Sequence, residues 1–289
     1  MKIVTHNGRF HSDDVFAVAT LLLVYPDAEV VRSRDEEMVR SADIVVDVGF
    51  VYDPEAKRFD HHQPEGAGER EGGIPYSSFG LVWKKWGREI AGEEEALLID
   101  KKLGYPIDAL DNGISIAENK FPEIREYTIY DLFSSYIDTD EYDEEVLLEK
   151  FLECVGIARA LLKREIDIAR KEIAGAKIVK EIFAKSEDRR IIILDKNLPW
   201  QKTLVPEPEA LYVIYPRKDG SWGARAIPKH LIGFESKKSF PQSWGGKGAK
   251  ELAKMTGVED AVFCHKGLFI CVAKTEKGAL KLAKIALDT

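Results

Sequence analysis

The pattern of apolar and polar positions divides the chain into two parts. Over residues 1–135, short apolar runs alternate with segments whose apolar residues recur at helical spacing. The run at 43–49 is almost continuously apolar, which is typical of a parallel strand covered on both faces. The other expected strands are at 2–6 and 28–33, and the expected helices are at 12–26, 35–42, 77–91, 93–103 and 106–118. Strands that alternate with helices predict an α/β fold with a doubly wound parallel sheet.

The second part follows one long helical segment. Residues 141–176 keep their apolar positions at helical spacing and contain no proline, so they predict a single helix. From residue 177 the pattern changes to short strands, the first of them at 177–183, with helical segments at 248–255 and 277–287. This mixture predicts a smaller α/β domain with a mixed sheet. The expected organisation is an amino-terminal domain over 1–140, a linker helix over 141–176 and a carboxyl-terminal domain over 177–289.

Composition and charge restrict the classes of function. The 289 residues are 45% apolar and 32% charged, with a formal net charge of -8. Such a chain has no overall attraction for nucleic acid, so it must meet any polyanion at a local basic site or through metal ions. The longest apolar runs, such as that at 15–24, are too short to span a bilayer, and no signal-peptide pattern is present. We expect a soluble, cytoplasmic protein with no membrane partner.

The three cysteines form neither a zinc knuckle nor a disulfide framework. Cys154, Cys264 and Cys271 include no CxxC pair. Because Cys264 and Cys271 lie in apolar, strand-like runs, we expect both to be buried, reduced thiols.

Histidines and aspartates gather at the ends of the predicted strands. Ligands of an open parallel sheet bind beyond the carboxyl ends of its strands. The residues placed there are His6, His11, Asp13 and Asp14 in "THNGRFHSDD", Asp47 in "VVDVG", Asp60, His61 and His62 in "FDHH", and Asp108 and Asp111 in "IDALDNGIS". A histidine pair on a polar turn is ordinarily just solvated. However, four of the six histidines fall within the first 62 residues beside these aspartates, and the group as a whole predicts a metal site.

The ligand types narrow the metal and the chemistry. Imidazole and carboxylate without cysteine suit manganese, magnesium, iron or zinc. Asp47 is the candidate bridge between two ions, because its strand has the most buried pattern and should lie near the centre of the sheet. Two ions about 3.5–4 Å apart can activate water and neutralise charge in an in-line displacement. This arrangement is typical of phosphoryl transfer.

These motifs resemble the DHH phosphoesterase superfamily. Within it, the resemblance is to the melanocyte-proliferating-gene-1 family, UPF0160, which is often described as a metal-dependent hydrolase. The four motifs occur in order at 5–13, 47–49, 59–63 and 111–115, and "SFPQSWGG" and "FCHKGLFI" resemble the carboxyl half of that family. The resemblance covers nearly the whole chain. It implies a DHH-type parallel-sheet domain, a helical linker and a smaller carboxyl-terminal domain that closes over a dimetal site.

The resemblance also implies roles for individual residues. The implied metal ligands are His6, His11, Asp13, Asp47 as the bridge, His61 and Asp111. His62 would contact the scissile phosphate, and Asp60 would orient a histidine. Two departures leave alternatives open. His11 stands where the superfamily usually has its first aspartate, so the role of Asp14 is open, and either Asp108 or Asp111 could be the fourth-motif ligand, with Asp111 favoured because it lies inside the motif.

The carboxyl-terminal part offers a candidate substrate clamp. Its residues are Arg225, Gly245, Gly246, Lys247, His265 and Lys266. Arg225 would also act catalytically, by stabilising with His62 the charge that develops on the phosphoryl oxygens. Exposed backbone N–H groups at the start of the helix at 248–255 would favour an anion, although glycine-rich loops often have no such role. Trp222 and Trp244 could stack a nucleic-acid base, but packing is the preferred interpretation.

The preferred function is a metal-dependent phosphodiesterase, a 3′–5′ exonuclease on single-stranded RNA or short oligonucleotides, with two Mn²⁺ or Mg²⁺ ions. One alternative is a phosphatase that acts on pyrophosphate or a mononucleotide. Another is a metal-stabilised binding protein without turnover. A homodimer is left open as a further partner.

Overall fold

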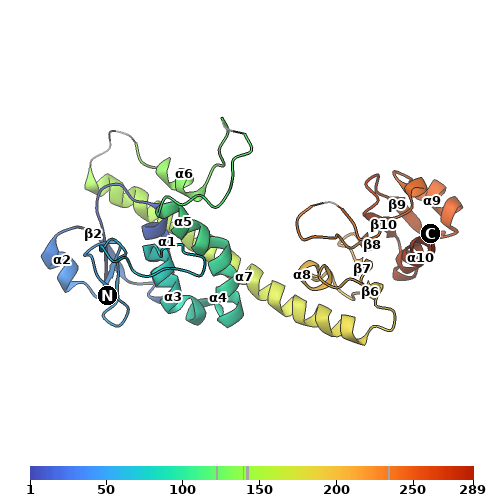
Figure 1. The fold of residues 1–289 in the computed structure, drawn as a ribbon, viewed down its shortest axis with the longest axis horizontal. Coiled ribbons are helices and arrows are strands. Elements are labelled where there is room, and N and C mark those ends of the chain that lie inside the picture. Colours follow the sequence, from blue (N-terminus) through green and yellow to red (C-terminus); the bar gives the residue numbers. More distant parts are fainter. Residues whose placement is uncertain (122, 139, 141–142, 234) are drawn as a thin grey trace. The chain divides into compact units, whose positions relative to one another are not determined.

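The chain forms two compact units, Met1–Arg170 and Lys171–Thr289 (Figure 1). The structure is a computed structural model that describes residues 1–121, 123–138, 140, 143–233 and 235–289. Each unit contains a five-stranded sheet and its own apolar core. The predicted α/β class is confirmed.

The first sheet places a single strand at its centre. In spatial order its strands are β2 (Glu29–Arg32), β1 (Lys2–Thr5), β3 (Ile44–Val46), β5 (Arg58–Phe59) and β4 (Tyr52–Asp53). All neighbours are parallel except β4, which forms an antiparallel hairpin with β5. Because β1, β3 and β5 run in one direction, their carboxyl ends meet at the same edge. The prediction that the 43–49 segment is a central, parallel strand is confirmed.

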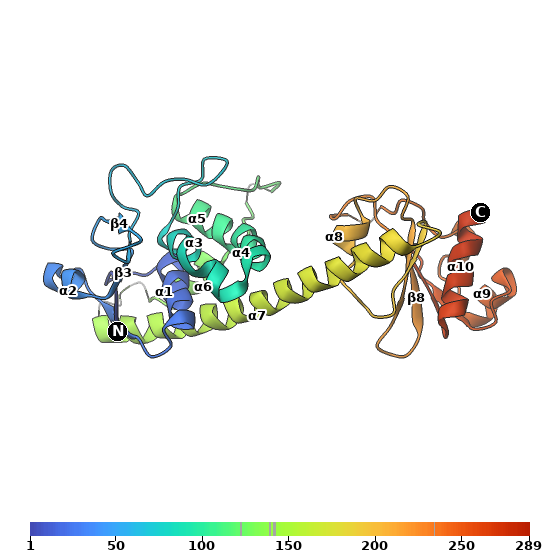
Figure 2. The same ribbon diagram turned by 90° about the horizontal axis from the view of Figure 1, so that it is seen from below.

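Apolar side chains alternate between the two faces of this sheet. Ile3 and Ile44 belong to the large core beneath α1 (Ser12–Val24), α3 (Ser78–Ala91) and the first half of α7 (Glu144–Lys185). Val4 and Val45 belong to a small separate cluster, against which Val39 of the short helix α2 (Glu36–Ser41) packs. Figure 2 shows α2 on the side of β3 away from α1. The period of two along the strands therefore supplies both faces of a doubly wound sheet.

The helix that carries the fourth motif ends earlier than expected. The chain passes through α4 (Glu93–Ile99), a π-helical turn η1 (Asp100–Gly104) and α5 (Tyr105–Asp111), and α6 (Ile129–Ser134) follows later. We expected a helix over 106–118, but α5 stops at Asp111 because Gly113 adopts φ +68°. A glycine in the left-handed region is a common helix terminator. The early end leaves Asp111 at the helix terminus.

The long helix is longer than predicted. Residues 177–183, expected to be a strand, lie inside α7, which runs to Lys185. Their β-branched residues suggested a strand, yet the apolar residues Val179 and Phe183 are four apart, as a helix face requires. Gly175 lies inside the helix and leaves room for Pro199, because a Cβ at position 175 would lie 2.5 Å from Cδ of Pro199. The two units divide at residues 170 and 171, within this helix.

The second unit has a mixed sheet. Its strands, in spatial order, are β6 (Ile191–Ile193), β7 (Tyr212–Pro216), β8 (Trp222–Ala226), β10 (Ile270–Ala273) and β9 (Ala261–Cys264). Only the β6–β7 pair is parallel. The remaining elements are α8 (Gln201–Leu204), η2 (Gln242–Trp244), α9 (Ala249–Thr256) and α10 (Glu276–Asp288). Cys264 and Cys271 are buried free thiols, as predicted. In the part of the chain described, no helix is both long and apolar enough to cross a bilayer.

Gly80 provides a test of how tightly α3 packs. A Cβ at Gly80 would lie 2.2 Å from Oδ2 of the buried Asp108, whereas a Cβ at Gly156 in α7 would meet nothing within 4 Å. Gly80→Ala should destabilise the protein by about 1–3 kcal/mol through overpacking. Gly156→Ala should stabilise it by about 0.5–1 kcal/mol through helix propensity. Urea denaturation measures both, and a Gly80→Ala protein as stable as the wild type would contradict this packing.

Candidate metal centre

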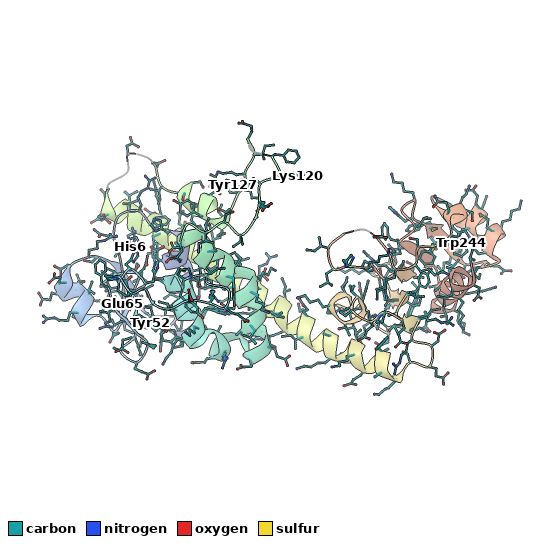
Figure 3. All side chains as sticks on the ribbon, in the orientation of Figure 1. His6, Tyr52, Glu65, Lys120, Tyr127 and Trp244 are labelled. Atoms are coloured by element: carbon teal, nitrogen blue, oxygen red, sulfur yellow. The ribbon has the colours of Figure 1, made fainter. Side chains whose placement is uncertain are left out.

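The carboxyl edge of the first sheet collects the predicted ligands. His6 follows β1, Asp47 follows β3, and the "DHH" residues follow β5. Asp13 and Asp14 lie in the first turn of α1, and both are fully buried. Negative charge in the first turn of a helix is favoured by the helix dipole. Figure 3 shows His6 within the body of the first unit.

Asp47 lies between two groups of ligands, and each of its oxygens faces one of them. Its Oδ2 is 3.3 Å from Nε2 of His6, and that nitrogen is 3.1 Å from Oδ2 of Asp14. Its Oδ1 is 3.3 Å from Nε2 of His61. A carboxylate in this position can bridge two cations.

The second group forms around His61. Its Nε2 is 3.3 Å from Oδ2 of Asp111 and 3.8 Å from Oδ2 of Asp13. His11, which caps the start of α1, offers a ring nitrogen to the same two aspartates. Three triads result, each with ligand atoms within 4.8 Å of one another: His6–Asp14–Asp47 and Asp47–His61–His62, which share Asp47, and His11–Asp13–Asp111.

Two buried carboxylate oxygens in this cluster are not fully satisfied. Oδ1 of Asp13 has no hydrogen-bond partner, and Oδ2 of Asp14 faces Nε2 of His6 at 3.1 Å without a further partner. Leaving a buried carboxylate oxygen without a partner is costly. Hard oxygen donors beside imidazole nitrogens suit a divalent cation such as Mn²⁺ or Mg²⁺. The residues therefore fit a metal ion, and the open oxygens identify where its ligands are.

The pKa values of the cluster show the same crowding of negative charge. Burial raises the pKa of Asp13 well above its usual range, and the charges of Asp47, Asp111 and Asp14 raise it further. Burial alone would also raise the pKa of Asp47, but its hydrogen bonds to His6 and His61 lower it. These carboxylates cannot all ionise together without a compensating cation.

His62 differs from its neighbour in both exposure and partner. Its side chain is 52% exposed, and its Nδ1 is 2.8 Å from Oδ1 of Asp60. The hydrogen bond to Asp60 raises the pKa of His62. Burial would raise the pKa of Asp60, but the hydrogen bonds from His62 and the Phe50 N–H lower it. Asp60 is thus an ionised acceptor that orients the ring and leaves Nε2 of His62 directed away from it.

Asp108 does not join the cluster. Its Oδ2 accepts a hydrogen bond from Nε of Arg70 at 2.6 Å, and its Oδ1 accepts one from the Ser77 hydroxyl at 2.6 Å. Arg70 also bonds Asp100 at 2.7 Å. The oxygens of Asp108 are therefore engaged in anchoring the start of α3. Of the two aspartates left open by the sequence, the structure brings Asp111 to His61.

Ser78 also contacts the metal centre, although it belongs to none of the four motifs. Its hydroxyl donates to Oδ1 of Asp47 at 2.8 Å, and its backbone N–H donates to Oδ2 of Asp13 at 3.3 Å. The signal for it was the serine pair at the start of the predicted helix at 77–91, where a helix N-terminus offers free donors. Ser77 and Ser78 together connect the Asp108 anchor to the metal cluster.

The predicted clamp lies in the second unit, and its backbone donors are already engaged. The N–H groups of Gly245, Gly246 and Lys247 donate to the carbonyls of Gln242, Cys264 and Trp244 respectively. The expectation that these N–H groups are available to an anion is therefore wrong. Trp244 is buried in the core of this unit, in agreement with the packing interpretation.

Within the second unit, contacts are already present for Arg225, Lys247 and His265. The Arg225 guanidinium lies 5.3 Å from the centre of the Phe269 ring and 6.0 Å from that of Trp200. Nζ of Lys247 pairs with Glu251 at 3.0 Å. Nδ1 of His265 accepts the N–H of Gly267, and Lys266 lies in the turn between β9 and β10.

Replacing single carboxylates should separate the two ligand groups. Asp47→Asn should remove bound metal almost completely, because both groups use its oxygens. Asp14→Asn and Asp111→Asn should each leave the other group intact and retain about half of the wild-type metal. Metal analysis after dialysis against Mn²⁺ measures this, with the exposed Glu55→Gln as control. If Asp47→Asn lost no more metal than Asp14→Asn, the bridging position would be contradicted.

Metal affinity should rise with pH. Burial would lower the pKa of His6, but Asp14 and Asp47 raise it to about 10 in the metal-free protein. A metal ligand must be neutral imidazole, so binding displaces this proton and affinity should increase about tenfold per pH unit between pH 7 and 9. The metal-free protein should instead lose stability as pH rises toward 10, because the folded-state pKa exceeds the unfolded value of 6.5. Mn²⁺ titrations that give a pH-independent affinity would contradict this protonation state.

Comparison with known proteins gives a consistent family across the whole chain. The model of the uncharacterised protein family UPF0160 matches residues 2–287. The MYG1 protein of Schizosaccharomyces pombe is 30% identical, and the alignment covers 100% of this chain and 98% of that protein. The proteins named MYG1 exonuclease from Homo sapiens and Bos taurus are 30% and 31% identical, over 99% of this chain and 85% and 84% of theirs.

Among solved structures, RecJ from Thermus thermophilus in complex with Mn²⁺ aligns at 12% identity over 100% of this chain and 52% of that chain. Its TM-score of 0.32 is too low to support an inference. The family match extends over both units and includes all four motifs that contribute to the metal centre. The chain belongs to the UPF0160 family, and the MYG1 proteins are relatives that it resembles over nearly its whole length.

Proposed function

We propose that this protein is a two-metal phosphodiesterase, a 3′–5′ exonuclease that acts on single-stranded RNA or short oligonucleotides. One observation carries the proposal: the two oxygens of the buried Asp47 face two separate groups of ligands. That its similar relatives in Homo sapiens and Bos taurus are named exonucleases supports the reaction class. The ions are Mn²⁺ or Mg²⁺, which the histidine and carboxylate ligands suit.

Each ligand group would hold one ion. His6 and Asp14 would hold the first, and His61, Asp13 and Asp111 the second, with Asp47 shared between them. His11 extends the second group on its exposed side. Such a pair of ions lowers the pKa of water and neutralises charge during an in-line displacement at phosphorus. The Ser78 hydroxyl keeps Asp47 oriented toward both groups.

His62 would bind the phosphate rather than a metal. Asp60 accepts its Nδ1–H and raises its pKa, which favours the imidazolium form. The exposed Nε2–H is then available to donate to a phosphoryl oxygen, where negative charge develops in the transition state. Asp60 acts through His62 and is a positioning residue. The two adjacent histidines therefore divide the work: His61 coordinates and His62 stabilises charge.

The net charge of the protein favours one class of nucleic-acid substrate. A chain with a net charge of -8 is better suited to the end of a single strand than to a long duplex.

The proposal includes substrate contacts in the second unit, through Arg225, His265 and Lys266. Arg225→Ala tests these contacts, and it should raise KM more than it lowers kcat.

Turnover can be measured directly with purified protein and Mn²⁺. Labelled single-stranded RNA, single-stranded DNA, dinucleotides and pyrophosphate serve as substrates, and nucleoside monophosphates should be released from the RNA and the dinucleotides. His62→Gln should lower kcat by about 10²–10³, the usual cost of losing a donor to a developing oxyanion, while its metal content stays unchanged. His230→Gln, which alters an exposed histidine of the second unit, is the matched control.

Two results would contradict the proposal. No release of product from any phosphodiester would favour a binding protein without turnover. Release from pyrophosphate alone would favour a small-molecule phosphatase.

A further inference from the structure

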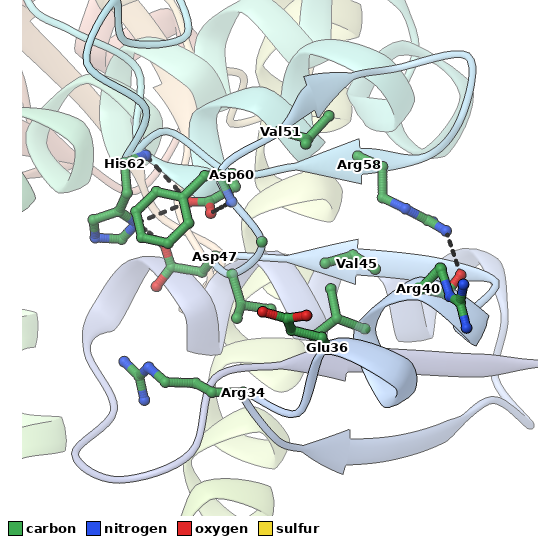
Figure 4. A pocket seen from close by; sticks show the side chains of 13 residues that line it. Arg34, Glu36, Arg40, Val45, Asp47, Val51, Arg58, Asp60 and His62 are labelled. Carbon is green, nitrogen blue, oxygen red and sulfur yellow. Dashed lines mark hydrogen bonds and ion pairs between the residues drawn. The ribbon is translucent and has the colours of Figure 1, made fainter.

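A cavity of about 690 Å³ lies beside the metal centre, within the first unit (Figure 4). Asp47, Asp60 and His62 line it and also belong to the metal centre and its support. In Figure 4, His62 and Asp47 stand at one end of the cavity, and Arg40 and Arg58 stand at the other. A group bound in this cavity would therefore adjoin a phosphate held at His62.

Most of the cavity wall is apolar. Val45 of β3 and Val39 of α2 belong to the small cluster on this face of the sheet. Phe50 and Val51 complete the wall, and their side chains are 69% and 48% exposed. An exposed aromatic ring beside a cavity offers a free face for stacking.

Phe50 is held in an unfavourable backbone conformation. Its φ is +57°, in the left-handed region that a bulky residue rarely adopts. Its N–H donates to Oδ2 of Asp60 at 2.5 Å, while Oδ1 of Asp60 holds the ring of His62. One carboxylate thus fixes both the aromatic wall of the cavity and the proposed phosphate donor. Strain of this kind is concentrated at binding sites.

The polar part of the cavity combines three arginines with His62 and three carboxylates: Arg34, Arg40, Arg58, Glu36, Asp47 and Asp60. Arg58 is used structurally, because its guanidinium donates to main-chain carbonyls that include those of Ala42 and Ala56. Arg34 is exposed and is held in place by Nη1 hydrogen bonds to the carbonyl and side-chain oxygens of Asn7. Its guanidinium retains further donors, which suit a phosphate.

We propose that this cavity binds the terminal nucleoside of the substrate, with the base stacked on Phe50 and the adjoining scissile phosphate held at His62, on the side of the cavity where Arg34 also stands. The inference rests on the proposed function and specifies where its substrate binds. The volume is within the range of about 300–1,000 Å³ found for small-molecule sites, which suits one nucleotide end and not a duplex. Pyrophosphate has no apolar part that could use the wall of Phe50, Val51 and Val45.

Equilibrium binding tests the cavity without depending on turnover. Isothermal titration of the Mn²⁺-loaded protein with AMP and with ribose 5-phosphate compares ligands that differ only by the base. AMP should bind about 5- to 150-fold more tightly, the range expected for stacking of one base on an aromatic ring. Phe50→Ala should reduce that preference to within about twofold of unity. Phe50→Gly should do the same while suiting the left-handed backbone.

Phe121→Ala is the matched control, because Phe121 is 60% exposed and does not line the cavity. It should retain the full preference for AMP. Equal binding of AMP and ribose 5-phosphate by the wild type, or an unchanged preference in both Phe50 variants, would overturn the inference. If hydrolysis of dinucleotides persists in that case, the cavity assignment alone fails. If no phosphodiester is cleaved but the base preference depends on Phe50, the proposed function fails and the cavity remains a nucleotide site.

Discussion

The structure depends on a buried concentration of carboxylates at one edge of a parallel sheet. Asp13, Asp14, Asp47 and Asp111 lie close enough that their charges oppose one another, and burial opposes each charge separately. Two histidines compensate part of this charge, and divalent ions would compensate the rest. The parallel strands, the first turn of α1 and the end of α5 are the elements that bring these groups together. The packing of the surrounding apolar core offsets the free energy that their burial costs.

A second buried network of hydrogen bonds and ion pairs fixes the position of the carboxylate cluster. Arg70 lies between the rings of Tyr76 and Tyr105, at 4.7 and 4.3 Å from their centres, and bonds Asp108. Asp108 holds Ser77, and the next residue, Ser78, bonds Asp47. The start of α3 therefore links the Arg70–Asp108 ion pair to the carboxylate of Asp47. Removing Arg70 would leave Asp108 buried without its cation, so its effect on the metal centre would be indirect.

Much of this arrangement follows from sequence. The apolar run before Asp47 identified the central strand, and histidines placed after successive strands identified the cluster, because parallel strands end at one edge. Contacts between segments distant in the chain could not be predicted from the sequence. The local sequence does not distinguish Asp108 from Asp111, because the difference is the hydrogen bond from the distant Arg70 to Asp108. Nor does it show that the N–H groups of Gly245 and Gly246 are hydrogen-bonded within their own unit. The helical course of 177–183 was missed because β-branched residues outweighed spacing. The cavity at Phe50 depends on a loop conformation that no pattern predicts.

The proposed function depends on Asp47 bridging two ions. Anomalous diffraction from crystals grown with Mn²⁺ tests it most directly. Two peaks about 3.5–4 Å apart are expected, one beside His6 and Asp14 and the other beside His61 and Asp111, with Asp47 coordinating both. A single peak, or two peaks that do not share Asp47, would contradict it.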